Sequence, residues 1–475
     1  MSPHLIGLLT AAAPEPIGDS ALTAANTAWL LASSALVLLM TPGLAFFYGG
    51  MTRAKSTLNM LMMSFVSIGI VSVLWVIYGY SIAFAPDKQS GLFGDLSIRF
   101  LHHESQTSVT NHLFDYAFIA FQLMFAIITL ALISGAVADR MKFSAWIAFS
   151  TIWVSLIYFP VAHWVFAFGV PLSGAKGEVA ANGAAVGFVQ GTGGWIVQRL
   201  GALDFAGGTA VHINAGAAGL ALCLVLGVRK GFGKEAMRPH NLPLVMIGTG
   251  MLWFGWFGFN AGSALVANGL AGIAFVNTQV ATAAAMLGWL LVERIRDGHF
   301  TTLGAASGAV AGLVAITPAC GTVSPSGAIA LGGVAGMICA VAISIKNRFG
   351  FDDALDVVGV HLVGGFVGTI LIGFLATRTT NGIGVDGLFY GGDASQLGKQ
   401  AVAAFAVMGY SFFGTLIIAL VLKATMGLRI SEEAEIVGID QSEHAETAYE
   451  WAGFSTGSTH GAPALAGTSA QRVVT

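Results

Sequence analysis

Two acid–histidine pairs are the residues in this sequence best suited to do chemistry. Asp204 precedes His212 by eight residues, and Asp353 precedes His361 by the same spacing, 149 positions further along the chain. Both histidines lie inside long apolar segments, where ionisable side chains are costly and usually mark a path for a substrate or a proton. The ordinary pKa of histidine, close to neutrality, suits proton transfer. The pairs therefore predict a transport path, although each histidine could instead only satisfy a neighbouring backbone group.

The composition places the chain in a lipid bilayer. Its 475 residues are 55% hydrophobic and 9% charged, with a mean hydropathy of +0.78, whereas soluble domains carry about 25% charged residues. Because about 20 apolar residues cross the hydrocarbon core, the apolar segments predict an all-α polytopic membrane protein with eleven transmembrane helices. The predicted spans are residues 26–50, 59–84, 112–138, 143–170, 204–228, 241–265, 271–293, 301–318, 325–345, 355–376 and 400–425, of which the eighth is the shortest.

Basic residues predict how the chain is oriented. Twelve of the 21 Lys and Arg residues fall in five alternate loops, and three more, Lys423, Arg429 and Arg472, lie at or after the end of the last span. Cytoplasmic loops retain positive charge, so we expect residues 1–25 outside, a membrane domain at 26–425 and a cytoplasmic tail at 426–475. An odd number of spans is required by this arrangement. The expected location is the plasma membrane.

Two features at the ends of the chain carry further expectations. Leu5–Ala13 is apolar, so a cleaved signal peptide is an alternative interpretation, but no basic residue precedes it. The tail is acidic at first and then rich in Gly, Ser, Thr and Ala, which predicts disorder over its last ~20 residues.

Other classes of site find little support in the sequence. Cys223, Cys320 and Cys339 are scattered in apolar spans without the CxxC spacing of zinc sites or a disulfide framework. No basic patch interleaved with aromatic residues indicates nucleic acid as a partner. We therefore expect no cofactor, no metal site and no nucleic-acid partner.

The two acid–histidine pairs also predict an internal symmetry. They begin the fifth and tenth spans and so run in opposite directions through the membrane, as in a 5+5 inverted repeat of spans 1 to 5 and 6 to 10, followed by an eleventh helix. At 1.5 Å per residue, each histidine lies ~12 Å inside its helix, so the two approach within about 6 Å along the normal of a ~30 Å core. Asp204, Asp353 and Asp356 have a structural alternative, because an acid at a helix start is most often a cap.

Four motifs carry a resemblance to a known family. They are Thr41–Gly50, Asp204–Asn214, Gly255–Ser263 and Asp356–His361. In this order they resemble the motifs of the ammonium transporter (Amt/Mep/Rh) family, close to its bacterial Amt branch, over residues 26–450. The resemblance implies eleven helices, a pore in each subunit of a homotrimer, and a tail that couples subunits near a docking site for a PII-type signalling protein.

The resemblance also implies roles for single residues. Phe125 and Phe259 match the stacked phenylalanines that close the outer end of the pore. Ser263 matches the hydroxyl that lines an outer recruitment vestibule, and His212 and His361 match the paired histidines of the pore.

The aromatic wall of the vestibule is where this sequence departs from the family pattern. Trp256 matches one wall aromatic, but the family's vestibule tryptophan soon after an Ala-His-x-Val element is missing. Here Ala162–Val165 is followed by Phe166 and then by an insertion that runs to about Gly194. Phe166 or the later Trp195 could supply the missing wall.

Together these residues predict an ammonium transporter that recruits the cation outside, deprotonates it, and conducts ammonia and a proton to the cytoplasm. One alternative is a passive ammonia or carbon dioxide channel of the Rh kind. Another is an ammonium sensor that signals through its tail. An enzyme is disfavoured, because no nucleophile–base pair or metal-ligand cluster accompanies the histidines.

Overall fold

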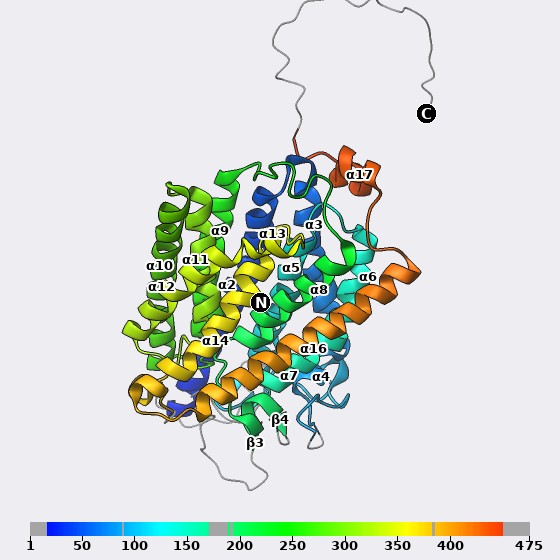
Figure 1. Ribbon diagram of the computed structural model, residues 1–475. Coiled ribbons are helices and arrows are strands. Elements are labelled where there is room, and N and C mark those ends of the chain that lie inside the picture. Colours follow the sequence, from blue (N-terminus) through cyan, green and yellow to red (C-terminus); the bar gives the residue numbers. More distant parts are fainter. Residues whose placement is uncertain (1–16, 88–89, 171–188, 191–192, 382–384, 450–475) are drawn as a thin grey trace, which may run out of the picture.

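The computed structural model describes residues 17–87, 90–170, 189–190, 193–381 and 385–449. Nearly all of this part of the chain is helical, and the helices pack side by side in one body (Figure 1). The predicted all-α membrane fold is thereby confirmed.

The first half of the chain is built from composite helices, in which an α-helix continues through a short 3-10 or π segment. The elements are α2 (Ile17–Met51), η1 (Ala54–Ser56), α3 (Thr57–Leu74), η2 (Trp75–Gly79), α4 (Tyr80–Phe84), η3 (Arg99–Leu101), α5 (Asp115–Ile133), η4 (Ser134–Val137), α6 (Phe143–Trp153), η5 (Val154–Tyr158), α7 (Phe159–Phe166), η6 (Trp195–Leu200), η7 (Gly208–Ile213) and α8 (Asn214–Leu226). Two short sheets join loops: β1 (Val109–Thr110) pairs antiparallel with β2 (Leu113–Phe114), and β3 (Gly169–Val170) pairs parallel with β4 (Val189–Gln190).

In the second half most of the long helices are uninterrupted, and only α14 continues from a π segment, η8. The elements of this half are α9 (Leu242–Gly262), α10 (Gly269–Asp297), α11 (Thr302–Ile316), α12 (Pro325–Ala342), α13 (Ile345–Phe349), η8 (Val358–Leu362), α14 (Val363–Leu375), α15 (Arg378–Asn381), η9 (Leu388–Tyr390), α16 (Ser395–Thr425), α17 (Glu432–Val437) and α18 (Ile439–His444).

The spans agree with the pattern of apolar segments. Within the described residues, 10 helices are long and apolar enough to cross a membrane. Helix α11 is apolar but only 15 residues long, and it lies where the sequence predicts the shortest span. Counting α11 gives a number consistent with the eleven expected.

The ends of several spans differ from expectation. Helix α2 begins at Ile17 rather than near residue 26, because residues 17–25 contain helix-forming Ala and Leu and no proline. The fifth and tenth spans begin at Gly208 and Val358, a few residues after the predicted starts. Leu5–Ala13 and the last ~20 residues lie outside the described part of the chain.

The basic loops share one end of the helical body with the tail. The Lys55 Nζ atom donates to the carbonyl of Glu435, the Lys142 N–H to that of Leu428, and the Lys230 N–H to the Glu435 carboxylate. We call this end the tail face. Helix α17 lies there, whereas β3 and β4 lie at the other end, the opposite face (Figure 1).

Candidate functional site

Two matching turns begin the elements that carry the histidines. At Asp204–Thr209, the Asp204 carboxylate accepts the backbone N–H groups of Gly207, Gly208 and Thr209 at 2.6 to 2.8 Å, and also the Thr209 hydroxyl. At Asp353–Val358, the Asp353 carboxylate accepts the N–H groups of Val357 and Val358 at 3.0 and 2.7 Å. Capping carboxylates satisfy the first N–H groups of a helix, so both turns fix where the helix starts. We call them the cap turns.

The cap turns lead into π segments that bring the two histidines together. The Nδ1 atoms of His212 in η7 and His361 in η8 lie 3.3 Å apart, with ring centroids 5.4 Å apart and an interplanar angle of 24°. Both side chains are buried. Glycines allow the approach, because a Cβ on Gly365 would lie 2.9 Å from the His212 Cβ, and one on Gly216 would overlap Leu362. The histidines, 149 residues apart, therefore form one pair in the folded chain.

The histidine pair continues into two phenylalanines. The rings of Phe125 and Phe259 stack at 4.1 Å and 27°, and Phe259 faces His212 at 6.1 Å and 26°. All four rings are buried. We call Phe125, Phe259, His212 and His361 the ring column.

Trp256 and Ser263 lie beside the ring column on α9. The Trp256 ring stacks on His212 at 5.4 Å and 19°, and its Nε1–H donates to the Thr317 hydroxyl at 2.8 Å. The Ser263 hydroxyl donates to the carbonyl of Phe259 at 2.8 Å, one turn earlier. The oxygen of Ser263 therefore keeps acceptor capacity next to the Phe259 end of the column.

Of the two candidates for the missing wall aromatic, the structure places Phe166 beside the ring column. The rings of Phe166 and Phe125 meet edge to face at 6.0 Å. A Cβ on Gly207 would lie 3.2 Å from the Phe166 ring, so Phe166 also touches the first cap turn. Trp195 instead packs on Trp164, with ring centroids 5.7 Å apart.

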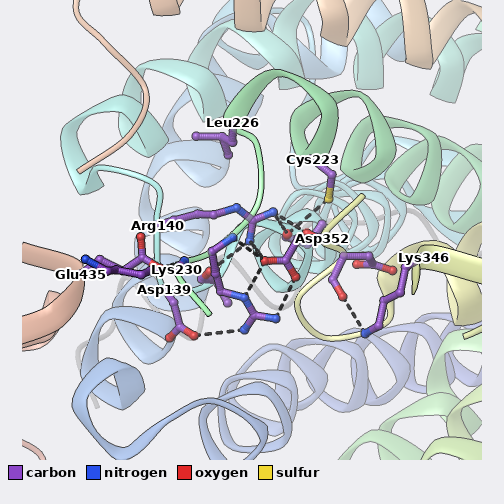
Figure 2. A network of polar contacts seen from close by, with 12 residues as sticks. Asp139, Arg140, Cys223, Leu226, Lys230, Lys346, Asp352 and Glu435 are labelled. Atoms are coloured by element: carbon purple, nitrogen blue, oxygen red, sulfur yellow. Dashed lines mark hydrogen bonds and ion pairs between the residues drawn. The ribbon is translucent and has the colours of Figure 1, made fainter. Parts of the chain in front are cut away.

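A buried ion network ties the helix ends together at the tail face (Figure 2). The Arg229 guanidinium donates to both Asp352 carboxylate oxygens at 2.8 Å and to Asp139 at 3.1 Å, and Arg53 donates to Asp139 at 3.1 Å. Arg140, fully buried, donates to the backbone carbonyls of Ala136 and Asp352. These residues follow spans 1, 3 and 5 or precede span 10, so the network links four spans.

The charges in this network shift the pKa values of its acids. Burial raises the pKa of the Asp139 carboxyl, but the charges of Arg229 and Arg53 outweigh burial and hold it below its ordinary value. The Asp352 carboxyl has the same balance: burial opposes ionisation, and the hydrogen bonds of Arg229 with the charge of Arg140 lower the pKa overall. Both acids are therefore ionised at neutral pH, and each is compensated by arginine.

The tail supplies three carboxylates that bind helix ends of the membrane domain. Asp440 accepts the N–H groups of Leu58 and Asn59 at 3.0 and 2.8 Å, which caps α3. Glu443 accepts the Phe143 N–H at 2.9 Å and caps α6. Glu435, whose side chain is 1% exposed, accepts the Lys230 N–H at 2.7 Å just after α8 and also pairs with Arg429 of the tail at 2.8 Å.

Known proteins similar to this chain belong to the family that its motifs resemble. A model of the Ammonium Transporter Family matches residues 28–449. The chain belongs to the ammonium transporter family. It is 57% identical over 448 residues to an ammonium transporter of Mycobacterium tuberculosis, covering 90% of each chain, and 46% identical over 433 residues to one of Bacillus subtilis, covering 90% of this chain and 98% of the relative.

Solved structures of this family have the same fold. The crystal structure of Mep2 from Candida albicans aligns with a TM-score of 0.76 at 34% identity, covering 86% of this chain and 87% of that one. A structure named Sensor Amt Protein aligns with a TM-score of 0.78 at 28% identity, covering 89% and 99%. As a member of the ammonium transporter family, the chain is a membrane transport protein rather than an enzyme.

Sequence reasoning missed the residues that hold the site in place. Thr317 binds Trp256, and Asp139 with Asp352 neutralises arginines that the sequence analysis used only to orient the chain. A signal was available for Asp139, which stands beside Arg140 at a span end, whereas Asp352 is flanked by Phe351 and Asp353 and has no adjacent base. The sequence did not show which acid meets which base.

Proposed function

We propose that this ammonium transporter recruits NH4+ at the opposite face, removes its proton there, and conducts NH3 along the ring column toward the tail face. The proton follows through the paired histidines. The observation that carries this proposal is the continuous stack from Phe125 through Phe259 and His212 to His361.

The charge of NH4+ is the main energetic barrier to its passage. Moving a bare cation into a narrow apolar passage costs far more than the passage could return. Recruitment and deprotonation before entry avoid that cost. At the opposite face, the Ser263 oxygen can accept a hydrogen bond from NH4+, and the Phe125, Phe166 and Phe259 rings can contribute about 0.5–2 kcal/mol of cation–π attraction. Asp204 contributes to this region by forming the first cap turn, because its carboxylate oxygens already accept hydrogen bonds from the backbone of that turn.

The chemistry of the histidine pair suits a proton path. A hydrogen bond between the two Nδ1 atoms requires one to donate and the other to accept, so the neutral pair holds its proton asymmetrically. Within the described residues, the buried Nε2 atom of His212 has no hydrogen-bond partner. A passing NH3 can provide one, and a tautomer exchange can move a proton along the pair.

The proposal includes an orientation and an assembly. The basic loops gathered at the tail face support a cytoplasmic position for that face by the positive-inside rule. We propose that the N-terminus lies outside and that the chain resides in the plasma membrane. We also propose that the chain forms a homotrimer and that a PII-type signalling protein binds at the tail face. Both proposals rest on family resemblance.

A passive NH3 or CO2 channel and an ammonium sensor are the competing functions. The similarity to the Sensor Amt Protein, at 28% identity, keeps the sensor as the second candidate. Current measurements on purified protein in liposomes distinguish the transporter, the passive channel and the sensor. We expect ammonium to evoke a current that saturates with concentration across a pH series. A chain that passes NH3 without current is a passive channel, and one that binds ammonium without flux is a sensor.

A further inference from the structure

A third buried histidine lies outside the ring column, on the helix that carries Phe166. His163 is fully buried in α7, three residues before Phe166. Its Nδ1 atom lies 2.9 Å from the backbone carbonyl of Ala83 in α4. A carbonyl can only accept, so Nδ1 carries the hydrogen. The ring thus ties the end of α7 to α4.

The other ring nitrogen of His163 faces a carboxylate. Nε2 lies 3.8 Å from the Asp87 Oδ2 atom, and among the described residues it has no hydrogen-bond partner. In the neutral ring with hydrogen on Nδ1, the Nε2 lone pair points toward a negative oxygen, which is unfavourable in a buried site. A proton on Nε2 converts this contact into a charge-assisted interaction.

The Asp87 carboxylate also binds the backbone at the opposite face. It accepts the Gly91 N–H at 3.0 Å, and the Gly91 carbonyl accepts the Trp195 N–H at 3.0 Å. Gly194 lies so close to the carbonyls of His163 and Trp164 that a Cβ there would overlap them. His163 therefore lies against Ala83 of α4, Asp87 and the backbone of Gly194 before η6.

The charges around His163 are few. The other elements packed against α7 carry Tyr80, Tyr158, Arg199 and His212 as titratable side chains, whereas the electrostatic interaction with the His163 ring comes from Asp87. A change in the protonation of this pair acts directly on the end of α7.

We infer that His163 is a positioning residue for the outer aromatic wall, and that a proton shared with Asp87 holds α7 so that Phe166 stays against Phe125. The inference rests on the proposed function, because it assumes that Phe166 helps to recruit ammonium. His163 itself touches no substrate. Loss of the shared proton loosens the contact and weakens recruitment without blocking conduction.

The test measures ammonium-evoked currents of the purified full chain in liposomes at external pH values from about 4 to 8, which covers protonation of a buried histidine as well as of an exposed one. We expect the apparent KM of the wild type to rise as pH rises through this range. His163→Ala should raise KM roughly two- to tenfold, the size of one lost cation–π contact, with a nearly unchanged maximal current.

Asp87→Asn should flatten the pH dependence of KM, because its amide can donate to Nε2 at every pH. Exposed His102 offers a matched control, and His102→Gln should behave as the wild type.

Two further variants separate positioning from a merely structural role. His163→Gln keeps an amide donor for Ala83 but cannot be protonated, so its KM should not vary with pH, which also covers the case in which His163→Ala fails to fold. His163→Ala combined with Phe166→Ala should raise KM no further than Phe166→Ala alone. The inference would be overturned by a wild-type KM in His163→Ala at every pH. It would also be overturned by a wild-type pH profile in Asp87→Asn or in His163→Gln, or by additive effects in the double variant.

A labelling experiment tests the inference without transport. Cys223, Cys320 and Cys339 are buried, so a water-soluble thiol reagent added outside should report mainly on Phe166→Cys. We expect faster labelling when His163→Ala is added, and an unchanged rate would overturn the inference. If the wild type carries no ammonium current, the proposed function fails, and the labelling result still decides whether His163 positions residue 166.

Discussion

His212 and His361 form a hydrogen bond with each other through their ring nitrogens. Their Nδ1 atoms meet at 3.3 Å, and the stacked rings of Trp256 and Phe259 hold His212 in place. Because these contacts are made by ring faces, a leucine of similar volume can fill the position of either histidine. The chemistry of the pair can therefore be removed while the packing is largely kept.

We expect His212→Leu to leave a folded protein and to abolish proton-coupled current, because leucine is compatible with the buried site but cannot carry a proton. Adding His361→Leu should reduce the current little further, since residues that act as a unit have non-additive effects. An Asp at either position keeps a titratable group and should retain partial current with altered selectivity. Currents in liposomes across a pH series check this, and wild-type currents in His212→Leu would leave only a structural histidine pair.

Phe259 separates the Ser263 end of the site from the histidines. Phe259→Ala removes a ring that stacks on both Phe125 and His212, and truncating a buried phenylalanine costs about 3–5 kcal/mol, so we expect lower thermal stability. Water should then reach the histidines, and discrimination of ammonium against potassium should fall. The measurement is the ratio of ammonium to potassium currents, and an unchanged ratio would show that Phe259 does not exclude water or larger ions.

The two cap turns are similar elements in different electrostatic settings. The second turn contains Asp356 and lies near Lys346. Burial raises the pKa of the Asp353 carboxyl to about 6, with Lys346 opposing the rise and Asp356 adding to it. An unfolded aspartate titrates near about 3.9. The folded chain therefore keeps this proton to higher pH, so its stability falls as pH rises from about 4 to about 6.

Asp353→Asn should remove this contribution, so the fall in melting temperature between pH of about 4.5 and 6.5 should be smaller than in the wild type. Asp139 is the matched control, because its pKa is below the ordinary value and it stays ionised across this range. Asp139→Asn should lower stability at every pH in the range without changing the slope. Identical slopes for Asp353→Asn and the wild type would show that Asp353 does not titrate there.

The contact of α17 with the membrane domain can be tested with two glutamates of the same helix. Glu435→Ala removes the carboxylate that accepts from Arg429 and from the Lys230 N–H, while Arg429 keeps the Leu226 carbonyl as an acceptor. Because the Arg429 side chain is 30% exposed, we expect a loss of about 1.5–3 kcal/mol, the range for a hydrogen bond to a charged group. The Glu432 side chain is 81% exposed, and Glu432→Ala should change stability by no more than about 0.5 kcal/mol. Thermal unfolding in detergent compares them, and equal effects would show that Glu435 does not anchor the tail.

At the scale of the whole molecule, the tail closes over helix ends that begin far away in the sequence. Truncation after Lys423 would remove the Asp440 and Glu443 caps of α3 and α6, each worth about 1 kcal/mol, together with the Glu435 anchor. We expect the truncated protein to reach the membrane and to transport more slowly than the full chain. The measurement is ammonium current normalised to the amount of protein inserted, and equal currents would show that tail docking does not affect transport.

The sequence by itself determined the membrane class, the positions of most spans and the meeting of the two histidines. These follow from local patterns: apolar runs must cross a bilayer of known thickness, and two equal acid–histidine spacings in opposite directions place both rings near its centre. Four ordered motifs also predicted the family.

Only the tertiary structure decided which side chains meet across the molecule. It placed Phe166 rather than Trp195 beside Phe125, joined Arg229 to Asp352 and Asp139, and directed the tail carboxylates to the starts of α3 and α6. None of these contacts has a periodic signal, because each joins residues far apart in the chain. Their partners are selected by helix packing and by the need to neutralise every buried charge.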